Sequence, residues 1–505
     1  MTPPEGSLAR TPAPRASGRG KGRQVHGRTV LRITGFLCML FSTTLLPPLL
    51  VSLWYRDGEA GHLAVGLLVM AGSGLLLWLS GLGQPVELRR RDGFLLVALF
   101  WCLLSLLGLF PFLFGLDLSL VDALFESVSG LTTTGATVLS GLDALPPSLL
   151  FYRQEIQWFG GMGLIVLAVA IMPMLGIGGM SIYRAEAPGP MKDEKMTPRL
   201  AHGARALWML YLGITVACAL AFWGAGMTPF DAVAHSLSTV STGGFSTHDA
   251  SIAWFHSPAI EWIATLFMLL GSINFAIHYV AATSHDIRCY WQDTEVRTFL
   301  LLILAAVLLI SLMLEQAGVE ESWHAAVRHS TFEVVSVITS TGYGVESFAG
   351  WPLFLPVLML FISFVGGCGG STAGGMKVMR VLVLAKLGWR ELRRLPHPRS
   401  VLQIKIGGRR LREQTLQAIW GFFAVYVATF VILMLSMMAT GLDQVTAFSA
   451  IATCMNNLGP GLGEVSETFA GIGDTAKLVA VAAMLLGRLE VFTILVLLQP
   501  AYWRG

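Results

Sequence analysis

The sequence predicts an all-α integral membrane protein with about ten transmembrane helices, eight of them in four pseudo-symmetric repeats around a central axis. Composition is the first reason: 54% of the 505 residues are hydrophobic, only 13% are charged, and the mean hydropathy is +0.66. Soluble globular domains do not have such a composition. The other two reasons are apolar segments long enough to cross a bilayer, and four similar glycine-bearing loops spaced along the chain.

Apolar segments of roughly 20 residues recur along the whole chain, and each is about long enough to cross a bilayer as a helix. We expect membrane-spanning helices at residues 30–53, 62–82, 93–114, 153–176, 202–225, 258–281, 295–316, 353–384, 414–440 and 474–500. The first two, within residues 30–83, precede the repeats. The repeats then occupy residues 93–176, 202–281, 295–384 and 414–500.

Basic residues lie unevenly between these spans, and such loops favour the cytoplasmic side. They cluster in a Pro-, Arg- and Gly-rich tail at residues 1–29, which we expect to be disordered, and in a linker at residues 385–413. Acidic residues dominate the opposite loops. Ten spans with both termini in the cytoplasm agree with this charge bias. The first span is interpreted as an uncleaved anchor, and the basic linker either binds membrane lipid or docks a cytosolic partner.

Polar segments too short to cross the membrane lie inside each repeat. The first three carry a glycine preceded by a threonine, and an apolar residue stands ten positions before that glycine; the pairs are Thr134–Gly135, Thr242–Gly243 and Thr341–Gly342. In the fourth, Gly459 follows Asn457 and Leu458, so its register is uncertain by one residue. The glycines recur at intervals of about 100 residues, as in a repeat protein.

Each polar segment begins with a helix-start signal, at Ser119, Thr228, Ser322 and Asp443. About ten helical residues follow, which span roughly 15 Å, half of a bilayer of about 30 Å. We therefore expect four re-entrant half-helices that end near the membrane midplane. Their C-terminal ends favour a cation, and the glycine loops expose backbone carbonyls as ion ligands. Ordinary extracellular turns would explain one such loop but not four.

These motifs together resemble a known family. The loops "TTGAT", "STGGFS", "STGYG" and "NNLGPGLG", with "WFGGMGLIV", "GGCGGSTAGGMK" and "GRLEVFTILVL", are similar to the TrkH-type potassium uptake subunits of the Trk, Ktr and HKT superfamily. The resemblance implies a potassium-selective pore in the bacterial inner membrane. It also implies a homodimer and a cytosolic TrkA-type ring that binds the nucleotide, so we expect no organic cofactor in this chain and no nucleic acid partner.

The resemblance assigns the selectivity filter to Gly135, Gly243, Gly342 and Gly459. Carbonyls of neighbouring residues are further candidate ligands, namely Thr134, Thr242, Thr341, Asn457 and Leu458. Plant relatives that prefer sodium carry a serine in the first of these glycine positions. Gly135 therefore favours potassium here.

A glycine-rich run interrupts the eighth span, with glycines at 366, 367, 369, 370, 374 and 375. Glycine weakens a helix by up to about 1 kcal/mol relative to alanine, so the helix should break here. The run lacks the Gly-Lys-Ser/Thr ending of a nucleotide-binding loop. Gly366, Gly367, Gly369, Gly370, Gly374 and Gly375 are interpreted as a flexible gate below the filter, as the resemblance implies; close helix packing is the structural alternative.

Two basic residues accompany this run. Arg488 is an intramembrane charge, which we expect to face the pore and to raise the barrier to cations or hold the gate closed; an ion pair with another span is the alternative. Glu490 is too close in sequence to face it on one helix. Lys377 follows the run and is either part of the gate or a cytoplasmic anchor.

Three classes of function are open to such a chain. A gated potassium pore explains the four repeats and the glycine-rich run. A proton- or sodium-coupled symporter would need more ionisable residues deep in its spans. We do not expect an enzyme, because no set of nucleophile and base, metal ligands or cofactor motif is present in the sequence.

Overall fold

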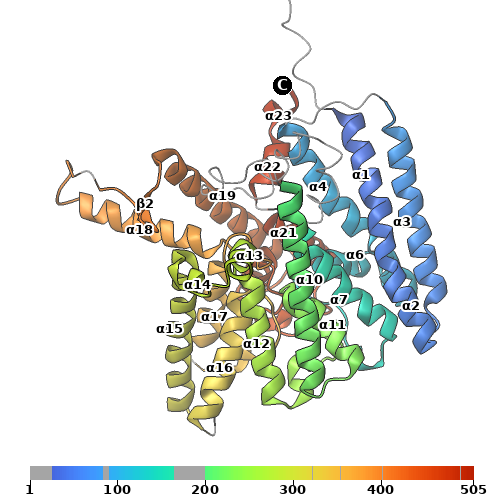
Figure 1. The fold of residues 1–505 in the computed structure, drawn as a ribbon, viewed down its shortest axis with the longest axis horizontal. Helices are drawn as coiled ribbons and strands as arrows, with labels where there is room; N and C mark the ends of the chain where they lie inside the picture. The colour runs from blue at the N-terminus through green and yellow to red at the C-terminus, as the bar shows by residue number, and fades with distance from the viewer. Residues whose placement is uncertain are drawn as a thin grey trace, which may run out of the picture.

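The structure is a computed structural model that describes residues 26–83, 90–163, 200–320, 322–352, 354–400, 402–489 and 491–504. Within these ranges the regular secondary structure is helical, apart from one short antiparallel hairpin formed by Lys405–Ile406 (β1) and Arg409–Arg410 (β2) (Figure 1). The prediction of an all-α fold is confirmed. Most of the predicted tail, the predicted fourth span beyond Gly163, and Glu490 lie outside the described residues.

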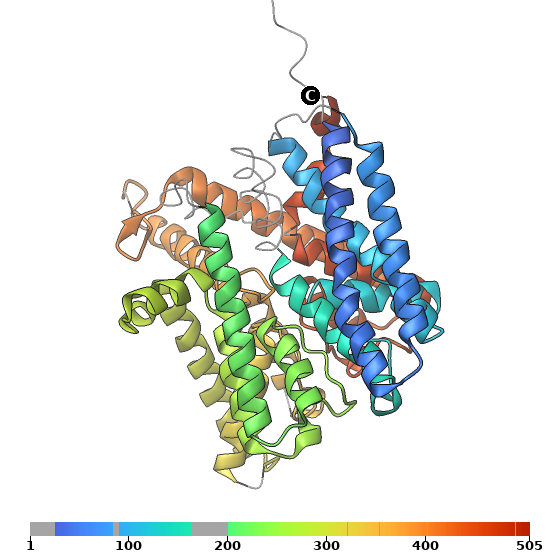
Figure 2. The same ribbon diagram turned by 45° about the vertical axis from the view of Figure 1, so that its right-hand side comes forward.

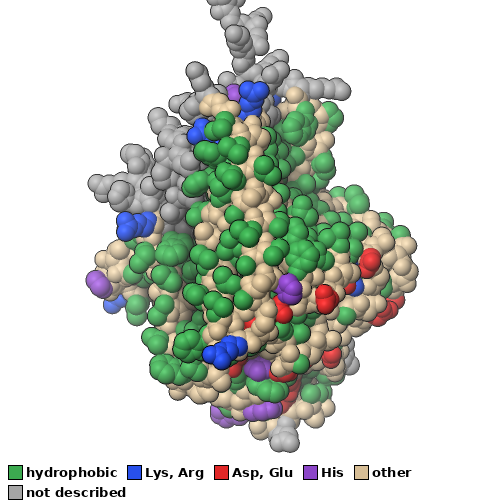
Figure 3. All heavy atoms as spheres, turned by 90° about the vertical axis from the view of Figure 1, so that its right-hand side faces the viewer, with side chains coloured by type: hydrophobic (Ala, Val, Ile, Leu, Met, Phe, Trp, Pro, Cys, Tyr) green, Lys and Arg blue, Asp and Glu red, His purple; other side chains and the backbone are tan. Residues whose placement is uncertain are grey.

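The first two helices form an antiparallel pair along one side of the molecule (Figures 1 and 2). They comprise α1 (Gly27–Ser42), continued by η1 (Thr43–Leu45) and α2 (Leu46–Tyr55), and then α3 (Ala60–Ser80). The pair packs closely because Gly35 and Gly74 face each other: a Cβ added at Gly35 would lie 2.5 Å from the Gly74 carbonyl oxygen. The face seen in Figure 3 carries mostly hydrophobic side chains, as a lipid-facing surface should.

Four units of similar design follow. The first contains α4 (Arg90–Leu107), α5 (Phe110–Gly115), α6 (Leu120–Leu131) and α7 (Pro147–Gly161). The second contains α10 (Leu200–Gly224), α11 (Pro229–Val240), α12 (Pro258–Ser272) and α13 (Phe275–Ser284). The third contains α14 (Arg288–Gln292), α15 (Thr294–Gln316), α16 (Trp323–Ile338), α17 (Leu355–Val365) and α18 (Val378–Arg394). The fourth contains α19 (Glu413–Met438), α20 (Gln444–Asn456), α21 (Asp474–Arg488) and α22 (Phe492–Leu498), before α23 (Pro500–Arg504).

The short helix of each unit begins where the sequence predicts. Its N-cap side chain accepts a hydrogen bond from a backbone N–H of the first turn, and the caps of α6, α11, α16 and α20 are Ser119, Thr228, Ser322 and Asp443. Single 3₁₀ turns lie in the loops after these helices, at Leu142–Ala144, Ser251–Phe255, Phe348–Gly350 and Gly463–Val465. We call α6, α11, α16 and α20 the half-helices.

The long apolar spans are less continuous than the sequence suggests. Among the described residues, six helices are long and apolar enough to cross a membrane. Two further spans are bent pairs, α12 with α13 at 98° and α21 with α22 at 109°. In the third unit α17 has only 11 residues and ends at the glycine-rich run. The spans predicted at 258–281 and 474–500 thus each consist of two helices joined at a bend, which hydropathy does not reveal because it reports burial in lipid and not helix continuity.

The hydrophobic core lies between units. One buried cluster joins the second and third units and includes Phe222, Phe299 and Phe332. A second joins α1 and α3 to the first unit, and a third joins the first unit to the fourth. This packing surrounds the loops that follow the half-helices.

Candidate functional site

The loops after the half-helices share one backbone conformation. In each, a backbone N–H donates to the carbonyl oxygen five residues earlier, at 2.8 or 2.9 Å; the donors are Thr134, Gly243, Thr341 and Leu458. The next residue is a glycine with positive φ, namely Gly135 (77°), Gly244 (83°), Gly342 (80°) and Gly459 (102°). The left-handed region is costly for residues with a Cβ, which explains the four glycines.

These loops close into a ring. A Cβ added at Gly135 would overlap the carbonyl oxygen of Gly243, and one at Gly244 would overlap that of Thr341. A Cβ at Gly342 would overlap the Leu458 oxygen, and one at Gly459 would lie 2.9 Å from the Thr134 oxygen. Each loop thus places one carbonyl against the glycine of the preceding loop, and the first loop places its carbonyl against the glycine of the fourth. The four carbonyls belong to Thr134, Gly243, Thr341 and Leu458, and we call them the carbonyl ring.

The structure corrects the register of the second loop. The sequence aligns Gly243 with Gly135, whereas the backbone pairs Gly135 with Gly244 and places Gly243 beside Thr134. Thr242 accordingly takes the position of Asn457, and both have a left-handed backbone with φ of 52°. The alignment failed because "TGG" offers two adjacent glycines, and the first one follows a threonine as in the other loops. In the fourth loop the uncertainty is resolved, because Leu458 and not Asn457 contributes to the carbonyl ring.

Buried polar side chains on three half-helices support this register. Each lies nine residues before the positive-φ glycine and binds the chain beyond it. Glu126 accepts from Val138 N–H at 3.2 Å, and Glu333 accepts from Val345 N–H at 2.8 Å. His235 Nε2 lies 3.0 Å from Ser246 Oγ. The sequence carries a signal for these residues, namely an ionisable side chain in the middle of an apolar half-helix.

Further buried hydrogen bonds fix the loops after the half-helices. Gln157 Nε2 donates to the Gly243 carbonyl at 2.7 Å, while its Oε1 accepts from Ser238 Oγ at 2.7 Å. Tyr343 O–H donates to the His235 carbonyl at 3.3 Å and so ties the third loop to α11. Asn457 Nδ2 donates to Thr134 Oγ1 at 3.0 Å and ties the fourth loop to the first. The carbonyl ring is therefore held by direct contacts and is preorganised.

The largest fully buried side chain beside the ring is Arg153 of α7. Its Nε donates to Glu126 Oε1 at 2.8 Å, and its Nη1 donates to the Ser246 carbonyl at 3.2 Å. Its guanidinium lies 4.1 Å from the centre of the Phe245 ring. Arg153 thus joins the first half-helix to the loop after the second half-helix, a contact that hydropathy alone does not reveal.

The glycine-rich run lies at the C-terminal ends of the half-helices. Its ends meet, because a Cβ added at Gly375 would lie 2.7 Å from Gly366 Cα. Thr372 Oγ1 donates to the Val240 carbonyl at the end of α11, at 3.2 Å. Gly374 N–H donates to Ser340 Oγ in the loop after the third half-helix, at 2.5 Å. The run therefore forms a closed loop directly beneath the carbonyl ring, and we call residues 366–375 the lower loop.

Hydrogen bonds to neighbouring helices hold other glycines of the lower loop. Gly369 N–H donates to Glu295 Oε1 at 2.8 Å, and the Gly370 carbonyl accepts from Phe275 N–H at 3.2 Å. The Gly367 carbonyl accepts from Val378 N–H at 3.1 Å. These contacts reach α13, α15 and α18, so the lower loop is fixed from several sides.

Arg488 and Lys377 both contact the lower loop. Arg488 Nη1 donates to the Thr372 carbonyl at 3.0 Å, and its Nη2 donates to the Gly160 carbonyl of α7 at 2.6 Å. Lys377 Nζ donates to the Ala373 carbonyl within the loop. The cation of Arg488 thus links the lower loop to the first unit, at the end of α21 where the last span bends.

Comparisons with known proteins agree with this geometry. A family model described as "TrkH: Cation transport protein" matches residues 63–504. The chain is 52% identical to a curated Trk system potassium uptake protein TrkH of Vibrio parahaemolyticus, over 95% of this chain and 99% of that protein. It is 50% identical to a protein of the same name from Escherichia coli, over 95% of this chain and 100% of that protein.

A solved structure is also similar. It is the crystal structure of the potassium transporter TrkH from Vibrio parahaemolyticus, with a TM-score of 0.86 and 50% sequence identity. The match covers 94% of this chain and 99% of that chain. The fold therefore agrees with that of an experimentally determined membrane transporter.

Proposed function

The chain belongs to the TrkH family of cation transport proteins, and we propose that it takes up potassium through a gated pore as the membrane subunit of a Trk-type system. The observation that carries this proposal is the closed ring of backbone carbonyls at the ends of four half-helices. Such carbonyls replace the hydration shell of an ion, and the helix C-termini favour positive charge.

The ion-facing groups of this proposal are the carbonyl ring and its glycines. They are Thr134, Gly135, Gly243, Gly244, Thr341, Gly342, Leu458 and Gly459. Thr242 and Asn457 lie one residue before the ring and support it. A single carbonyl layer of this kind implies few ordered potassium sites and moderate discrimination.

The lower loop is proposed as the gate. It lies under the carbonyl ring and is held by Arg488, Lys377 and Thr372. A positive charge at this position raises the barrier to cations until the loop moves. Its glycines provide the backbone freedom that such a movement requires.

The membrane setting and the partners follow from the family. We propose an inner-membrane location with both termini in the cytoplasm, since basic residues flank the described helices on the side of the lower loop. In the view of Figure 3, most Asp and Glu side chains gather at the opposite end, where the half-helices begin. The relatives are named as parts of a Trk system, which supports partnership with other Trk components. We propose that this chain forms a homodimer and works with a cytosolic, nucleotide-binding TrkA-type ring. The basic linker would dock that ring or bind lipid.

Rubidium uptake into liposomes tests the pore. For the purified protein alone, we expect uptake to be blocked by potassium far more than by sodium. Gly135→Ser should reduce that contrast by at least about tenfold, because a side chain at positive φ beside the Gly243 carbonyl costs about 1–2 kcal/mol or more. Gly471→Ser is the control, since a Cβ there meets nothing within 4 Å.

The same assay separates the pore from a coupled symporter. Uptake that depends on the rubidium gradient alone, whatever the proton or sodium gradient, supports the pore. Uptake that reverses with a proton gradient at fixed rubidium would support coupling instead. If no uptake occurs, adding the cytosolic ring tells whether the partner is required.

Releasing the lower loop should raise uptake. Arg488→Gln removes the cation that binds the Thr372 and Gly160 carbonyls, so we expect rubidium uptake to increase several-fold without the partner. Shortening the lower loop within 366–375 should act in the same direction. Arg393→Gln, on the exposed end of α18, is the control, and an Arg488→Gln protein with uptake no higher than the control would contradict the gate.

A further inference from the structure

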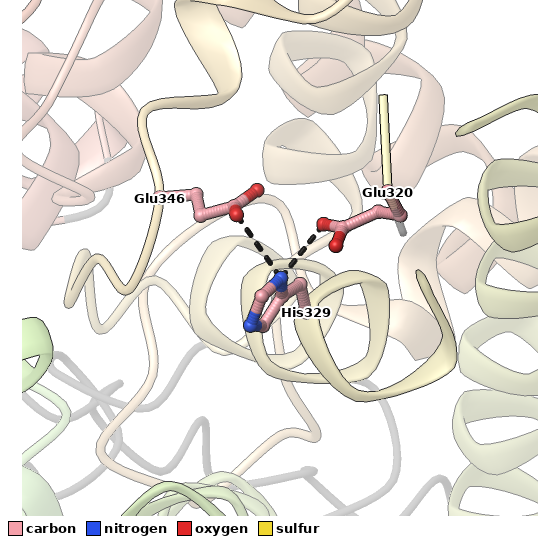
Figure 4. A group of neighbouring side chains, drawn as sticks. All are labelled: Glu320, His329 and Glu346. Atoms are coloured by element: carbon pink, nitrogen blue, oxygen red, sulfur yellow. Dashed lines mark hydrogen bonds and ion pairs between the residues drawn. The ribbon is translucent and has the colours of Figure 1, made fainter. Parts of the chain in front are cut away.

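Three ionisable side chains meet near the outer end of the third half-helix (Figure 4). Glu320 comes from the connection between α15 and α16, His329 from α16, and Glu346 from the chain that follows the third filter loop. His329 Nδ1 lies 2.7 Å from Glu320 Oε1 and 3.1 Å from Glu346 Oε1. Three separate segments thus bring three ligand atoms within 4.8 Å of one another.

The cluster has the chemistry of a transition-metal site. One imidazole nitrogen with two carboxylate oxygens is a donor set that Zn²⁺ accepts, and three protein ligands leave a fourth position for water. We propose that Glu320, His329 and Glu346 bind a divalent cation of the zinc type at the outer surface of the protein. The imidazole ligand sets this site apart from one for potassium or magnesium, which prefer oxygen ligands.

Burial and charge favour an added cation. The side chains of Glu320 and His329 are 7% and 12% exposed, while that of Glu346 is 35% exposed and opens the cluster to solvent. Two carboxylates share one imidazole, so the cluster carries net negative charge even when His329 is protonated. A neighbouring cation, Arg328, is itself paired with Glu261 at 3.2 Å.

A proton and Arg328 compete with the metal. Hydrogen bonds to Glu346 and Glu320 raise the pKa of His329 to about 9, so the metal must displace a proton from Nδ1. His329 Nε2 lies 2.9 Å from Arg328 Nη2. With the metal on Nδ1 the proton resides on Nε2, and the Arg328 side chain must turn away. Binding is therefore best measured at mildly alkaline pH.

The position of the site gives it a consequence for transport. Glu333 Oε1 already accepts from the N–H groups of Val345 and Glu346, at 2.8 and 3.1 Å. A metal on Glu346 would add a second tie between α16 and the chain leaving the carbonyl ring. Resting on the proposed function, we expect external Zn²⁺ to slow rubidium uptake by the wild type more than by Glu346→Gln.

Binding itself is tested without transport. Tag-free, metal-free protein in detergent is titrated with ZnCl₂ by calorimetry, and with Co²⁺ as a visible spectroscopic probe. We expect one saturable site. Its affinity for Zn²⁺ should fall by at least about tenfold in His329→Ala and in Glu346→Gln, because removing a metal ligand lowers the affinity at least as much as removing a residue that hydrogen-bonds to a ligand. His324→Ala removes an exposed imidazole from the same helix and should change nothing.

Two results would overturn the proposal. One is the absence of saturable Zn²⁺ binding by the wild type, and the other is binding that both ligand variants retain. Glu346→Gln keeps the shape of a half-exposed side chain, and an unchanged melting temperature would show that it folds. If Zn²⁺ binding holds but rubidium uptake fails both with and without the cytosolic ring, the proposed function is rejected and the metal site is not.

Discussion

Gly244→Ala should lower selective rubidium uptake by at least about 30-fold. The left-handed backbone costs alanine about 1–2 kcal/mol, and overlap with the Thr341 carbonyl adds about 1–3 kcal/mol, where 1.4 kcal/mol is tenfold. The new methyl group would push the Thr341 oxygen out of the carbonyl ring. Uptake into liposomes at equal protein incorporation measures the effect.

Gly243→Ala is the discriminating comparison. Gly243 lacks a positive φ, and a Cβ there would meet the Gln157 side chain and not a carbonyl of the ring. We therefore expect a smaller loss than for Gly244→Ala. If Gly243→Ala abolishes uptake while Gly244→Ala retains it, the register drawn from the backbone is wrong. Gly471→Ala, in open space, controls for the loss of a glycine as such.

Arg153→Met should cause the largest loss of stability. It leaves Glu126, which is 0% exposed, as a buried carboxylate without its cation. Breaking such a pair costs about 3–5 kcal/mol. The protein in detergent should therefore melt several degrees lower, as measured by the monodisperse fraction that remains after heating.

Two further variants separate the charge from the packing. Arg153→Met with Glu126→Gln removes the unpaired charge and should recover part of the loss, because a neutral amide costs less to bury. Arg390→Met breaks the partly exposed pair with Glu413 and should change the free energy of unfolding by less than about 1 kcal/mol. Equal melting of Arg153→Met and the wild type would show that the pair contributes no net stability.

Local chemistry explains what the sequence predicted well. Hydropathy located the long apolar helices of the described residues, because lipid requires such helices. The N-cap residues Ser119, Thr228, Ser322 and Asp443 predicted the starts of the half-helices. The glycine loops were found because a left-handed backbone requires glycine whatever surrounds it. Even the lower loop was visible as a run of glycines inside an apolar span.

Contacts between distant segments explain the features that the sequence did not predict. The register of Gly244 is set by the positive φ of the folded loop, where Thr341 from the next unit packs against it. The ring of carbonyls, the Arg153–Glu126 pair and the Glu320–His329–Glu346 cluster each join residues from separate segments. The sequence by itself determined the membrane fold, the four half-helices and the family resemblance. Only the tertiary structure decided the register of the second loop, the bends of the inner spans and the partners of the buried charges, because these depend on which loops pack together.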